Sequence, residues 1–221
     1  MNQERWTAVD QYIGRLLMPS DPALDAALVA SAAAGLPSIN VSPAQGKLLH
    51  LLARAQRARR ILEIGTLGGY STIWLARALE PGGKVITLEY NATHARVAQQ
   101  NLDHAGVAGL VEIRQGRALD TLPKLAAEKA GPFDFIFIDA DKPAITEYFD
   151  WSIRLSRIGT TIIVDNVVRD GEVIDAGSTD ANVQGVRRFN DALAAERRVS
   201  ATTIQTVGSK GYDGFTLAVV V

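Results

Sequence analysis

Two short apolar runs that end abruptly in acidic residues constrain the fold of this chain most strongly. The first covers residues 133–139 and ends at Asp139, and the second covers residues 161–165 and ends in Asp165-Asn166. Continuous β-branched and aromatic residues are typical of strands buried on both faces of a parallel sheet. Polar groups at the carboxyl ends of such strands lie at the mouth of an open α/β sheet, where ligands bind. We therefore expect these three oxygen-bearing side chains to meet at a ligand site, with Lys142 beside them as a possible base.

From Arg60 onward, strand and helix patterns alternate. Strand patterns cover residues 61–64, 85–89, 111–115, 133–139 and 161–165, and helix patterns lie between them, for example at residues 71–78, 92–105 and 145–155. Such alternation is typical of βαβ units, which build a parallel sheet through right-handed crossovers. The glycine-rich residues 208–214 join two further strand patterns, at 201–207 and 215–221, and favour an antiparallel hairpin. We predict an α/β fold: a doubly wound, seven-stranded, mostly parallel sheet with the last strand antiparallel and helices on both faces.

The first 59 residues are rich in Ala and Leu and show helical spacing. An apolar stripe runs from Trp6 to Leu17, a second helix pattern covers residues 23–34, and Ser42-Pro43 is typical of an N-cap followed by proline at the first helical position. We predict that residues 1–221 form one domain, with a helical extension at residues 1–59 and an α/β core at residues 60–221.

Composition narrows the classes of function. The chain has 221 residues and a net charge of −1, so charge favours neither nucleic acid nor an anionic membrane as a partner. The absence of cysteine excludes disulfides, thiolate metal sites and cysteine nucleophiles. No apolar run approaches the ~20 residues that span a bilayer, and the N-terminal residues lack the pattern of a signal peptide. We expect a cytoplasmic protein without nucleic-acid or membrane partners.

A glycine-rich turn follows the first predicted strand. It reads Glu63-Ile-Gly-Thr-Leu-Gly-Gly-Tyr-Ser71. Glycines there let a ligand approach the backbone, and the next helix presents free N–H groups to an anionic ligand group. Because Leu67 interrupts the spacing, the turn does not match the dinucleotide-binding G-x-G-x-x-G pattern, and both a ligand site and a plain tight turn remain open. Glu89 ends the second strand about 20 residues later, where an acid is placed either to accept the hydroxyls of a ribose or to be a solvated strand end.

Together these segments resemble a known family, the cation-dependent O-methyltransferases that use S-adenosylmethionine and include the catechol and caffeoyl-CoA O-methyltransferases. The resemblance runs from Ile39 to the last strand. Its most specific segments are Leu62-Glu-Ile-Gly65 with Gly69-Tyr-Ser71, then Asp139-Ala-Asp-Lys142, and then Asp165-Asn166. It implies methyl transfer from S-adenosylmethionine to a small phenolic molecule. It also implies a homodimer, for which the apolar stripe of the first helix offers a contact surface.

The resemblance further implies a role for each matching residue. The residues that would contact the cofactor are Val41, Glu63, Gly65, Thr66, Ser71, Glu89, Ala118, Asp139 and Asp141. Among them, Glu89 would hold the ribose and Ala118 would lie by the adenine. The divalent metal would be bound by Asp139, Asp165 and Asn166. Lys142, together with Asp139, would act in catalysis beside the substrate hydroxyl.

The chemistry of these residue types agrees with those roles. An all-oxygen ligand set suits Mg²⁺, with Mn²⁺ or Ca²⁺ as alternatives. A divalent cation bound to a phenol lowers the pKa of the phenol hydroxyl. Three protein ligands leave coordination positions for two adjacent substrate oxygens, which selects vicinal diols such as catechols. For Lys142, an ion pair with Asp141 or another acid is the alternative to a role as base.

Three features depart from better-known family members. Pro143-Ala-Ile follows Lys142, Asp170 stands where plant caffeoyl-CoA enzymes have an asparagine, and the final hairpin, with Lys210 and Tyr212, looks longer. They argue against a plant-type CoA-ester substrate and leave the metal and cofactor sites intact. Two other classes of function stay open. The broken glycine pattern disfavours a nicotinamide-dependent oxidoreductase, and the fold alone does not exclude a non-catalytic binding module.

Overall fold

The computed structural model describes residues 2–221, so Met1 of the predicted helical extension lies outside it. The strands are β1 Arg60–Ile64, β2 Lys84–Glu89, β3 Val111–Gln115, β4 Phe133–Ile138, β5 Ser156–Asp165, β6 Val199–Gly208 and β7 Gly211–Val220. The α-helices are α1 Gln3–Leu17, α2 Pro22–Ala33, α3 Pro43–Ala55, α4 Tyr70–Ala76, α5 Ala92–His104, α6 Ala118–Ala127, α7 Ile145–Arg154 and α8 Ala181–Ala195. Short 3₁₀ segments are η1 Ala108–Leu110, η2 Lys142–Ala144 and η3 Arg169–Ile174.

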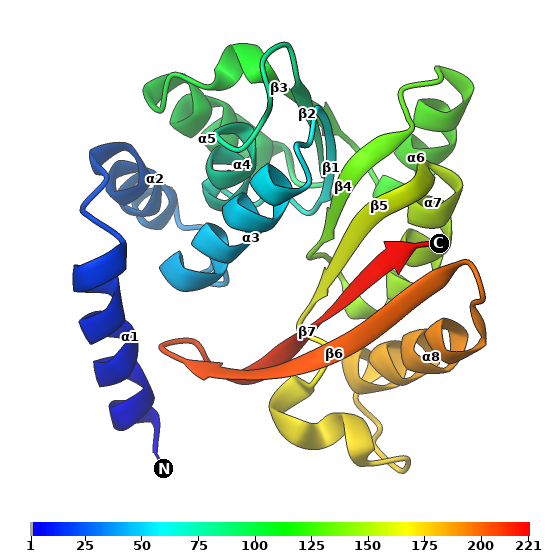
Figure 1. The fold of residues 1–221 in the computed structure, drawn as a ribbon. Helices are drawn as coiled ribbons and strands as arrows, with labels where there is room; N and C mark the ends of the chain where they lie inside the picture. The colour runs from blue at the N-terminus through cyan, green and yellow to red at the C-terminus, as the bar shows by residue number, and fades with distance from the viewer. Residues whose placement is uncertain (1) are drawn as a thin grey trace.

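The strands described form one seven-stranded sheet in the order β3-β2-β1-β4-β5-β7-β6 (Figure 1). The five strands β1 to β5 run parallel to one another. The last strand, β7, runs antiparallel to both of its neighbours, β5 and β6. This confirms the predicted sheet, and it places the carboxyl ends of β1 to β5 side by side at one end of the sheet.

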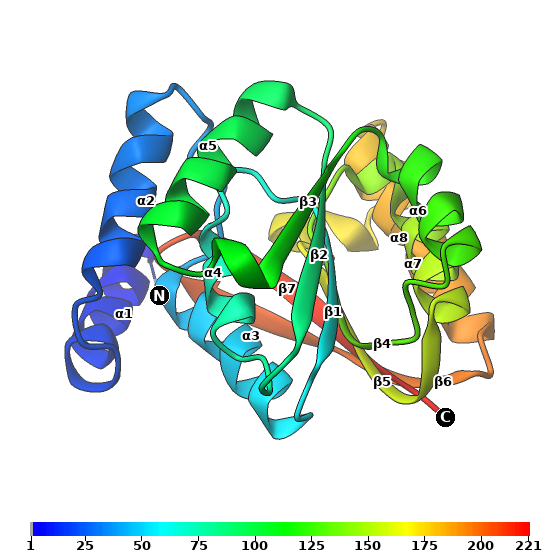
Figure 2. The ribbon, with the colours of Figure 1, turned by 90° about the horizontal axis from the view of Figure 1, so that it is seen from above.

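A separate set of helices covers each face of the sheet (Figure 2). Helices α6, α7 and α8 pack on one face, and helices α2 to α5 pack on the other. Successive side chains of a strand point to opposite faces, so in β1 the fully buried Ile61 joins the second set of helices while Leu62 and Ile64 join the first. Both faces are therefore apolar, which explains why the central strands read as continuous apolar runs.

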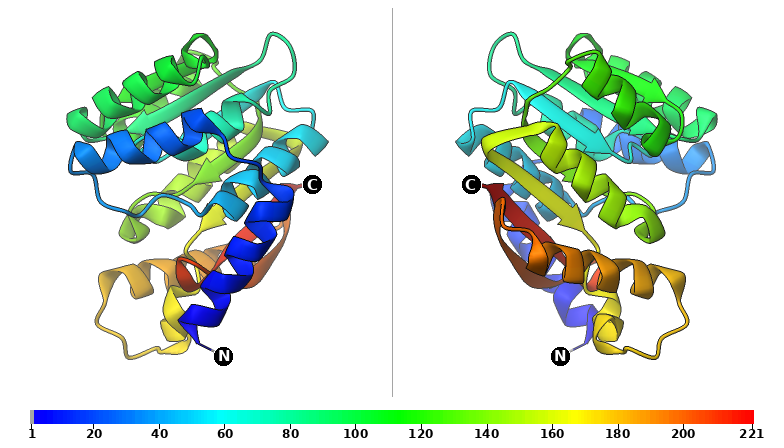
Figure 3. Two further views of the ribbon diagram at one scale, coloured as in Figure 1. Left: turned by 90° about the vertical axis from the view of Figure 1, so that its left-hand side faces the viewer. Right: turned by 90° about the vertical axis from the view of Figure 1, so that its right-hand side faces the viewer.

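Three helices precede the sheet, as predicted. Ser42 caps α3, because its hydroxyl accepts the Gln45 N–H at 3.2 Å. Pro22 opens α2, where proline fits the first helical position. Helix α1 contains no buried residue between its bounds and contacts β6 along the outside of the molecule (Figure 3).

The link between the last two strands is shorter than predicted. Residues 208–214 were expected to connect them, but Gly208 pairs with Gly211 and only Ser209 and Lys210 form the turn. The left-handed backbone of Gly211, with φ of +98°, makes so tight a turn possible. Gly214 belongs to the strand itself, since a Cβ there would lie 2.5 Å from the carbonyl oxygen of Ile204. The two strands therefore continue through most of the predicted link.

The tip of this hairpin joins three distant parts of the chain. The carboxylate of Asp10 in α1 accepts the Ser209 N–H at 2.7 Å, and the Gln3 side chain donates to the Gly208 carbonyl at 2.9 Å. The Lys210 ammonium donates to the Ser38 carbonyl at 3.0 Å, in the loop between α2 and α3. The hairpin tip is thus tied both to α1 and to that loop.

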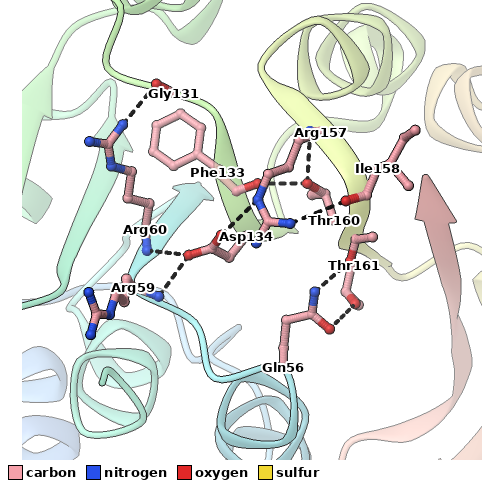
Figure 4. Close-up of polar contacts among 11 residues, drawn as sticks. Gln56, Arg59, Arg60, Gly131, Phe133, Asp134, Arg157, Ile158, Thr160 and Thr161 are labelled. Carbon is pink, nitrogen blue, oxygen red and sulfur yellow. Dashed lines mark hydrogen bonds and ion pairs between the residues drawn. The ribbon is translucent and has the colours of Figure 1, made fainter. Parts of the chain in front are cut away.

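The amino ends of the strands are fixed by a polar network around Asp134 (Figure 4). Its Oδ2 accepts the backbone N–H groups of Arg59 and Arg60 at 2.8 and 2.9 Å, and its Oδ1 accepts the Arg157 guanidinium at 2.7 Å. Burial raises the pKa of the Asp134 carboxyl, but these donors outweigh it and hold the pKa below its usual value. The network joins β1, β4 and β5 at the end of the sheet opposite to the predicted site. No helix within residues 2–221 has the length and apolar character to cross a membrane.

Candidate active site

A cavity of about 760 Å³ lies across the carboxyl ends of the parallel strands, a size suited to a cofactor and a small substrate. Each strand from β1 to β5 supplies part of its wall through the residues that follow or end it, including Gly65, Glu89, Gly116, Asp139 and Asn166. The loop after α2 supplies Pro37, Ile39, Asn40 and Val41. Because the strand order is β3-β2-β1-β4-β5, the wall runs from Gly116 at one end to Asn166 at the other.

The glycine-rich turn is both a tight turn and part of this wall. Gly65 has φ of +103°, and a Cβ there would lie 1.9 Å from the carbonyl oxygen of Asp139. The end of β1 thus touches the end of β4, and only glycine permits that approach. Gly69, with φ of +80°, begins α4 in the left-handed region. The turn is therefore a tight turn, and it also lines the cavity.

Glu63 lies behind the wall and does not line the cavity. It is fully buried, its Oε1 accepts the Ser71 hydroxyl at 2.7 Å, and its Oε2 accepts the hydroxyls of Thr72 and Thr87 at 2.5 and 2.6 Å. Burial raises the pKa of the Glu63 carboxyl to about 7, and the three hydroxyl donors limit the rise. Ser71, by contrast, is on the wall. The other predicted cofactor residues on the wall are Val41, Gly65, Thr66, Glu89, Ala118, Asp139 and Asp141.

Glu89 is held rigidly at the end of β2. Its Oε2 accepts the Leu67 N–H at 2.8 Å, and its Oε1 accepts the Asn91 N–H at 2.8 Å. Each carboxylate oxygen can accept more than one hydrogen bond, so both keep capacity for a ligand hydroxyl. The His94 Nδ1 lies 3.6 Å from Oε1, also on the cavity wall. Glu89 is therefore a buried, hydrogen-bonded acid on the cavity wall and not a solvated strand end.

The predicted metal ligands come from two adjacent strand ends. β4 and β5 pair in parallel, so the end of β4, which leads into Asp139, lies beside Asp165 and Asn166 at the end of β5. Asp139 and Asn166 line the cavity, whereas Asp165 is 4% exposed and lies beneath the wall. Burial and the nearby charge of Asp139 raise the pKa of Asp165. Asn166 has φ of 56°, a strained backbone for a residue with a side chain.

These residues fit a hard divalent cation. Within residues 2–221, no three His, Cys, Asp or Glu side chains gather into a metal cage. The donor set here is instead two carboxylates and one amide, the oxygen ligands that Mg²⁺ and Ca²⁺ prefer. The buried carboxylate of Asp165 and the partly exposed carboxylate of Asp139 repel each other, and a cation between them would relieve that repulsion. The strained backbone of Asn166 agrees with a residue held in place for a ligand.

The sequence left open an ion pair between Lys142 and Asp141, but each of these residues has another partner. The Lys142 ammonium is buried and lies 3.4 Å from Asp139 Oδ1, so its ion pair is with Asp139 and not with Asp141. Asp141 instead accepts the Tyr148 hydroxyl at 2.5 Å. Burial, together with that acceptor, raises the pKa of Tyr148. Helix α8 packs directly on this loop, since a Cβ on Gly185 would lie 2.2 Å from the Lys142 carbonyl oxygen.

Several wall residues were not predicted from the sequence. They are Tyr70, His94, Arg117, Tyr148, Arg169 and Asn182. A signal existed for Tyr148, because α7 follows the predicted site loop at once and its first turns must stay near it. Of the residues named as departures, Ala144 lies on the wall, whereas Asp170 and Tyr212 do not. The Tyr212 hydroxyl instead bonds to Gln205.

Comparisons with known proteins agree with this site. The model of the O-methyltransferase family matches residues 21–220. The chain is 58% identical to a catechol O-methyltransferase of Niastella koreensis over 220 residues, covering 100% of both chains. A crystal structure of an O-methyltransferase from Bacillus cereus in complex with SAH is 59% identical, has a TM-score of 0.98 and covers 100% of both chains.

A second solved structure contains the methyl donor itself. TomG, an O-methyltransferase from Streptomyces achromogenes involved in tomaymycin synthesis, was solved in complex with SAM. It is 56% identical, has a TM-score of 0.96, and the match covers 100% of this chain and 99% of TomG. These matches decide against the oxidoreductase and the non-catalytic module. The chain belongs to the O-methyltransferase family, and it is an S-adenosylmethionine-dependent O-methyltransferase.

Proposed function

We propose that this enzyme transfers a methyl group from S-adenosylmethionine to one hydroxyl of a catechol-type molecule and that it requires a divalent cation, Mg²⁺ in the first place, with Mn²⁺ or Ca²⁺ as alternatives. One observation carries the proposal: Asp139, Asp165 and Asn166 lie at neighbouring strand ends beside Lys142, with Asp139 and Asn166 on the cavity wall and the buried Asp165 beneath it. The name of the Niastella koreensis relative, a catechol O-methyltransferase, supports the same methyl acceptor.

We assign different roles to the residues at the two ends of the cavity. We assign the end formed by the loops after β1, β2 and β3 to the cofactor. There Glu89 would accept the ribose hydroxyls and Ala118 would lie by the adenine. Ser71 would contact the methionine part, in an orientation fixed by its hydrogen bond to Glu63. Val41, Gly65, Thr66 and Asp141 would complete the enclosure.

At the other end we assign Asp139, Asp165 and Asn166 to the cation. Bound there, the cation would lower the pKa of a phenol hydroxyl that coordinates to it. Lys142 lies on the wall, with its Nζ 3.4 Å from Asp139 Oδ1, and in its neutral amine form it would take up the hydroxyl proton. The rigid walls would then hold the ring so that its oxygen faces the methyl group in line, since orientation dominates the rate of such transfers.

The test compares a catechol with its monophenol analogue under controlled metal content. With saturating Mg²⁺ we expect the catechol to exceed the monophenol in kcat/KM by about a hundredfold, because the second oxygen fixes the orientation. EDTA should abolish turnover and added Mg²⁺ should restore it. Asp165→Ala should lower turnover at least roughly a hundredfold while retaining the circular dichroism spectrum. Asp191→Ala, at an exposed acid of α8, is the matched control and should behave like the wild type.

Two results would contradict the proposal. Full turnover in EDTA would remove the cation from the mechanism. Equal kcat/KM for the catechol and the monophenol would remove chelation as the basis of selectivity.

We also propose that the enzyme is a homodimer in the cytoplasm with no nucleic-acid or membrane partner. The homodimer is supported by the apolar side chains that α1 leaves exposed, Val9, Tyr12, Ile13, Leu16 and Leu17. A twofold-symmetric pair is the commonest closed assembly.

A further inference from the structure

Arg169 lies at the end of the cavity farthest from the adenine end. The wall follows the strand order β3-β2-β1-β4-β5, from Gly116 after β3 to Asn166 at the end of β5, and Arg169 follows Asn166 by three residues. Asn182, near the start of α8, shares this end of the wall. A group here is positioned to contact the methyl acceptor and not the cofactor.

The N–H donors of the Arg169 side chain are not used in hydrogen bonds within residues 2–221. A guanidinium carries five N–H donors, yet within residues 2–221 the Arg169 side chain makes no hydrogen bond, and its Nε is buried without a partner. Its ion pair with Asp213 is long, with Arg169 Nη1 3.8 Å from Asp213 Oδ2. The side chain is 31% exposed, so the charge is only partly solvated. No partner among the described residues uses the fork geometry that makes arginine suited to planar anions.

The backbone that carries Arg169 is fixed at a cost in strain. Arg169, Asp170 and Gly171 have φ of 56°, 56° and 89°, all in the left-handed region. Asp213 holds this turn, because its Oδ1 accepts the N–H groups of Val168 and Arg169 at 2.9 and 3.0 Å. Backbone strain that the surroundings maintain is concentrated at functional sites. The hydrogen bonds that hold the turn do not involve the guanidinium, which has only the 3.8 Å ion pair with Asp213 among the described residues and so keeps its N–H donors for a ligand.

We propose that Arg169 selects methyl acceptors that carry a carboxylate on the catechol side chain. The two ring hydroxyls would face the cation ligands, and the carboxylate would receive two parallel N–H donors from Arg169. This inference rests on the proposed catechol function. It adds to that function a specific class of acceptor, anionic catechols, and a residue that recognises it.

The experiment measures kcat/KM for three acids and their methyl esters with saturating Mg²⁺ and S-adenosylmethionine. The acids are 3,4-dihydroxybenzoate, 3,4-dihydroxyphenylacetate and 3-(3,4-dihydroxyphenyl)propionate, which vary the reach from the ring to the carboxylate. We expect at least one acid to exceed its ester in the wild type. In Arg169→Gln that acid should lose roughly ten- to hundredfold, the worth of a hydrogen bond between charged groups, while its ester stays unchanged. Comparing the acid-to-ester ratio of the wild type with that of Arg169→Gln cancels differences in phenol acidity, because each substrate has the same acidity with both enzymes.

Three controls separate recognition from folding. Arg169→Lys keeps the charge but not the fork and should retain part of the acid preference. Arg154→Gln removes an exposed arginine of α7 and should leave every ratio unchanged. Calorimetric affinity of the preferred acid for the complex with Mg²⁺ and S-adenosylhomocysteine should fall in Arg169→Gln, and the melting temperature should not.

Each failure has a separate meaning. An acid-to-ester ratio that is the same in the wild type and in Arg169→Gln, for all three pairs, would overturn the role of Arg169. An equal loss of kcat/KM for acid and ester in Arg169→Gln would overturn it too, because the effect would then come from the strained turn. No turnover of any catechol, acid or ester, by the wild type with Mg²⁺ would instead refute the proposed function.

Discussion

At the scale of single residues, Glu63 has the most unusual environment. The carboxyl is fully buried behind the cavity wall, and three hydroxyl groups donate to it. Two of the donors, Ser71 and Thr72, belong to the first turn of α4, and the third, Thr87, belongs to β2. Glu63 therefore fixes α4 against the sheet, and through Ser71 it shapes the wall.

Glu63 should also make stability depend on pH. Its pKa in the folded state, about 7, lies above the ordinary value of 4.5. Between these two values the folded state keeps a proton that the unfolded state has released, so the free energy of unfolding falls as pH rises from about 4.5 to about 7. The full effect is at most ~3 kcal/mol.

Urea unfolding at pH 5, 6, 7 and 8 measures this effect. Glu63→Gln cannot ionise, so its stability should decline less across this range than that of the wild type. Glu147→Gln, at an exposed glutamate of α7, should follow the wild type. If the free energy of unfolding falls equally with pH in the wild type and in Glu63→Gln, burial does not raise the pKa of Glu63.

The sequence predicted the site residues at strand ends and missed those from helices and loops. Asp139, Asp165, Asn166 and Glu89 end apolar strands, and strand ends in a parallel sheet share one location. The position of Glu63 behind the wall could not be read, because it depends on which face of β1 the helix α4 covers. His94, Tyr148 and Arg169 were missed because they come from helices and a loop, whose direction over the cavity depends on packing.

At the scale of elements, α8 supports the loop that carries Lys142. Gly185 lets the two approach, since a Cβ there would lie 2.2 Å from the carbonyl oxygen of Lys142 and 2.9 Å from the nitrogen of Pro143. Both neighbours are backbone atoms, which have no rotamer through which to move away. The position of Lys142 in the site thus depends on a helix that begins 39 residues later in the chain (181 against 142).

Gly185→Ala should therefore reduce activity more than it reduces stability. Overpacking of this kind costs about 1–3 kcal/mol, and the better helix propensity of Ala returns up to ~1 kcal/mol. Displacing Lys142 by ~1 Å should lower kcat/KM up to roughly a hundredfold. Gly109→Ala is the matched control, since a Cβ there meets nothing within 4 Å. Unchanged kcat/KM in a folded Gly185→Ala would mean that the Lys142 loop does not depend on α8.

Elements were predicted more reliably than their ends. The alternation of apolar runs and helical spacing identified all five parallel strands. Strands β1, β2 and β4 are buried over most of their length, whereas β3, at the edge of the sheet, is only half-buried. The final hairpin was misjudged, since its glycines serve different purposes: Gly211 makes the turn and Gly214 lies within a strand. Only the pairing partner distinguishes these uses, and that partner is not visible in local sequence.

At the scale of the whole molecule, the outer face of α1 should decide the assembly. Leu16 and Leu17 are 64% and 69% exposed, and an obligate interface needs such apolar surface. Light scattering should give twice the 23.7 kDa of the chain. The double variant Leu16→Glu/Leu17→Glu should give the monomer mass, whereas Ile158→Glu, at an exposed residue of β5, should remain dimeric. A wild-type protein that scatters as a monomer at micromolar concentration would refute the homodimer.

The hairpin tip has a consequence for how the enzyme responds to its own abundance. Asp10 joins α1 to Ser209, and Lys210 joins the same tip to Ser38, one residue from the cavity-lining Pro37 and Ile39. These hydrogen bonds connect α1 to the cavity wall. In the proposed homodimer, pairing of two chains through α1 and occupation of the cavity would therefore be thermodynamically linked, and each would strengthen the other by the same factor. On this view the affinity for S-adenosylmethionine rises with enzyme concentration, and dilution alone loosens the hold on the methyl donor.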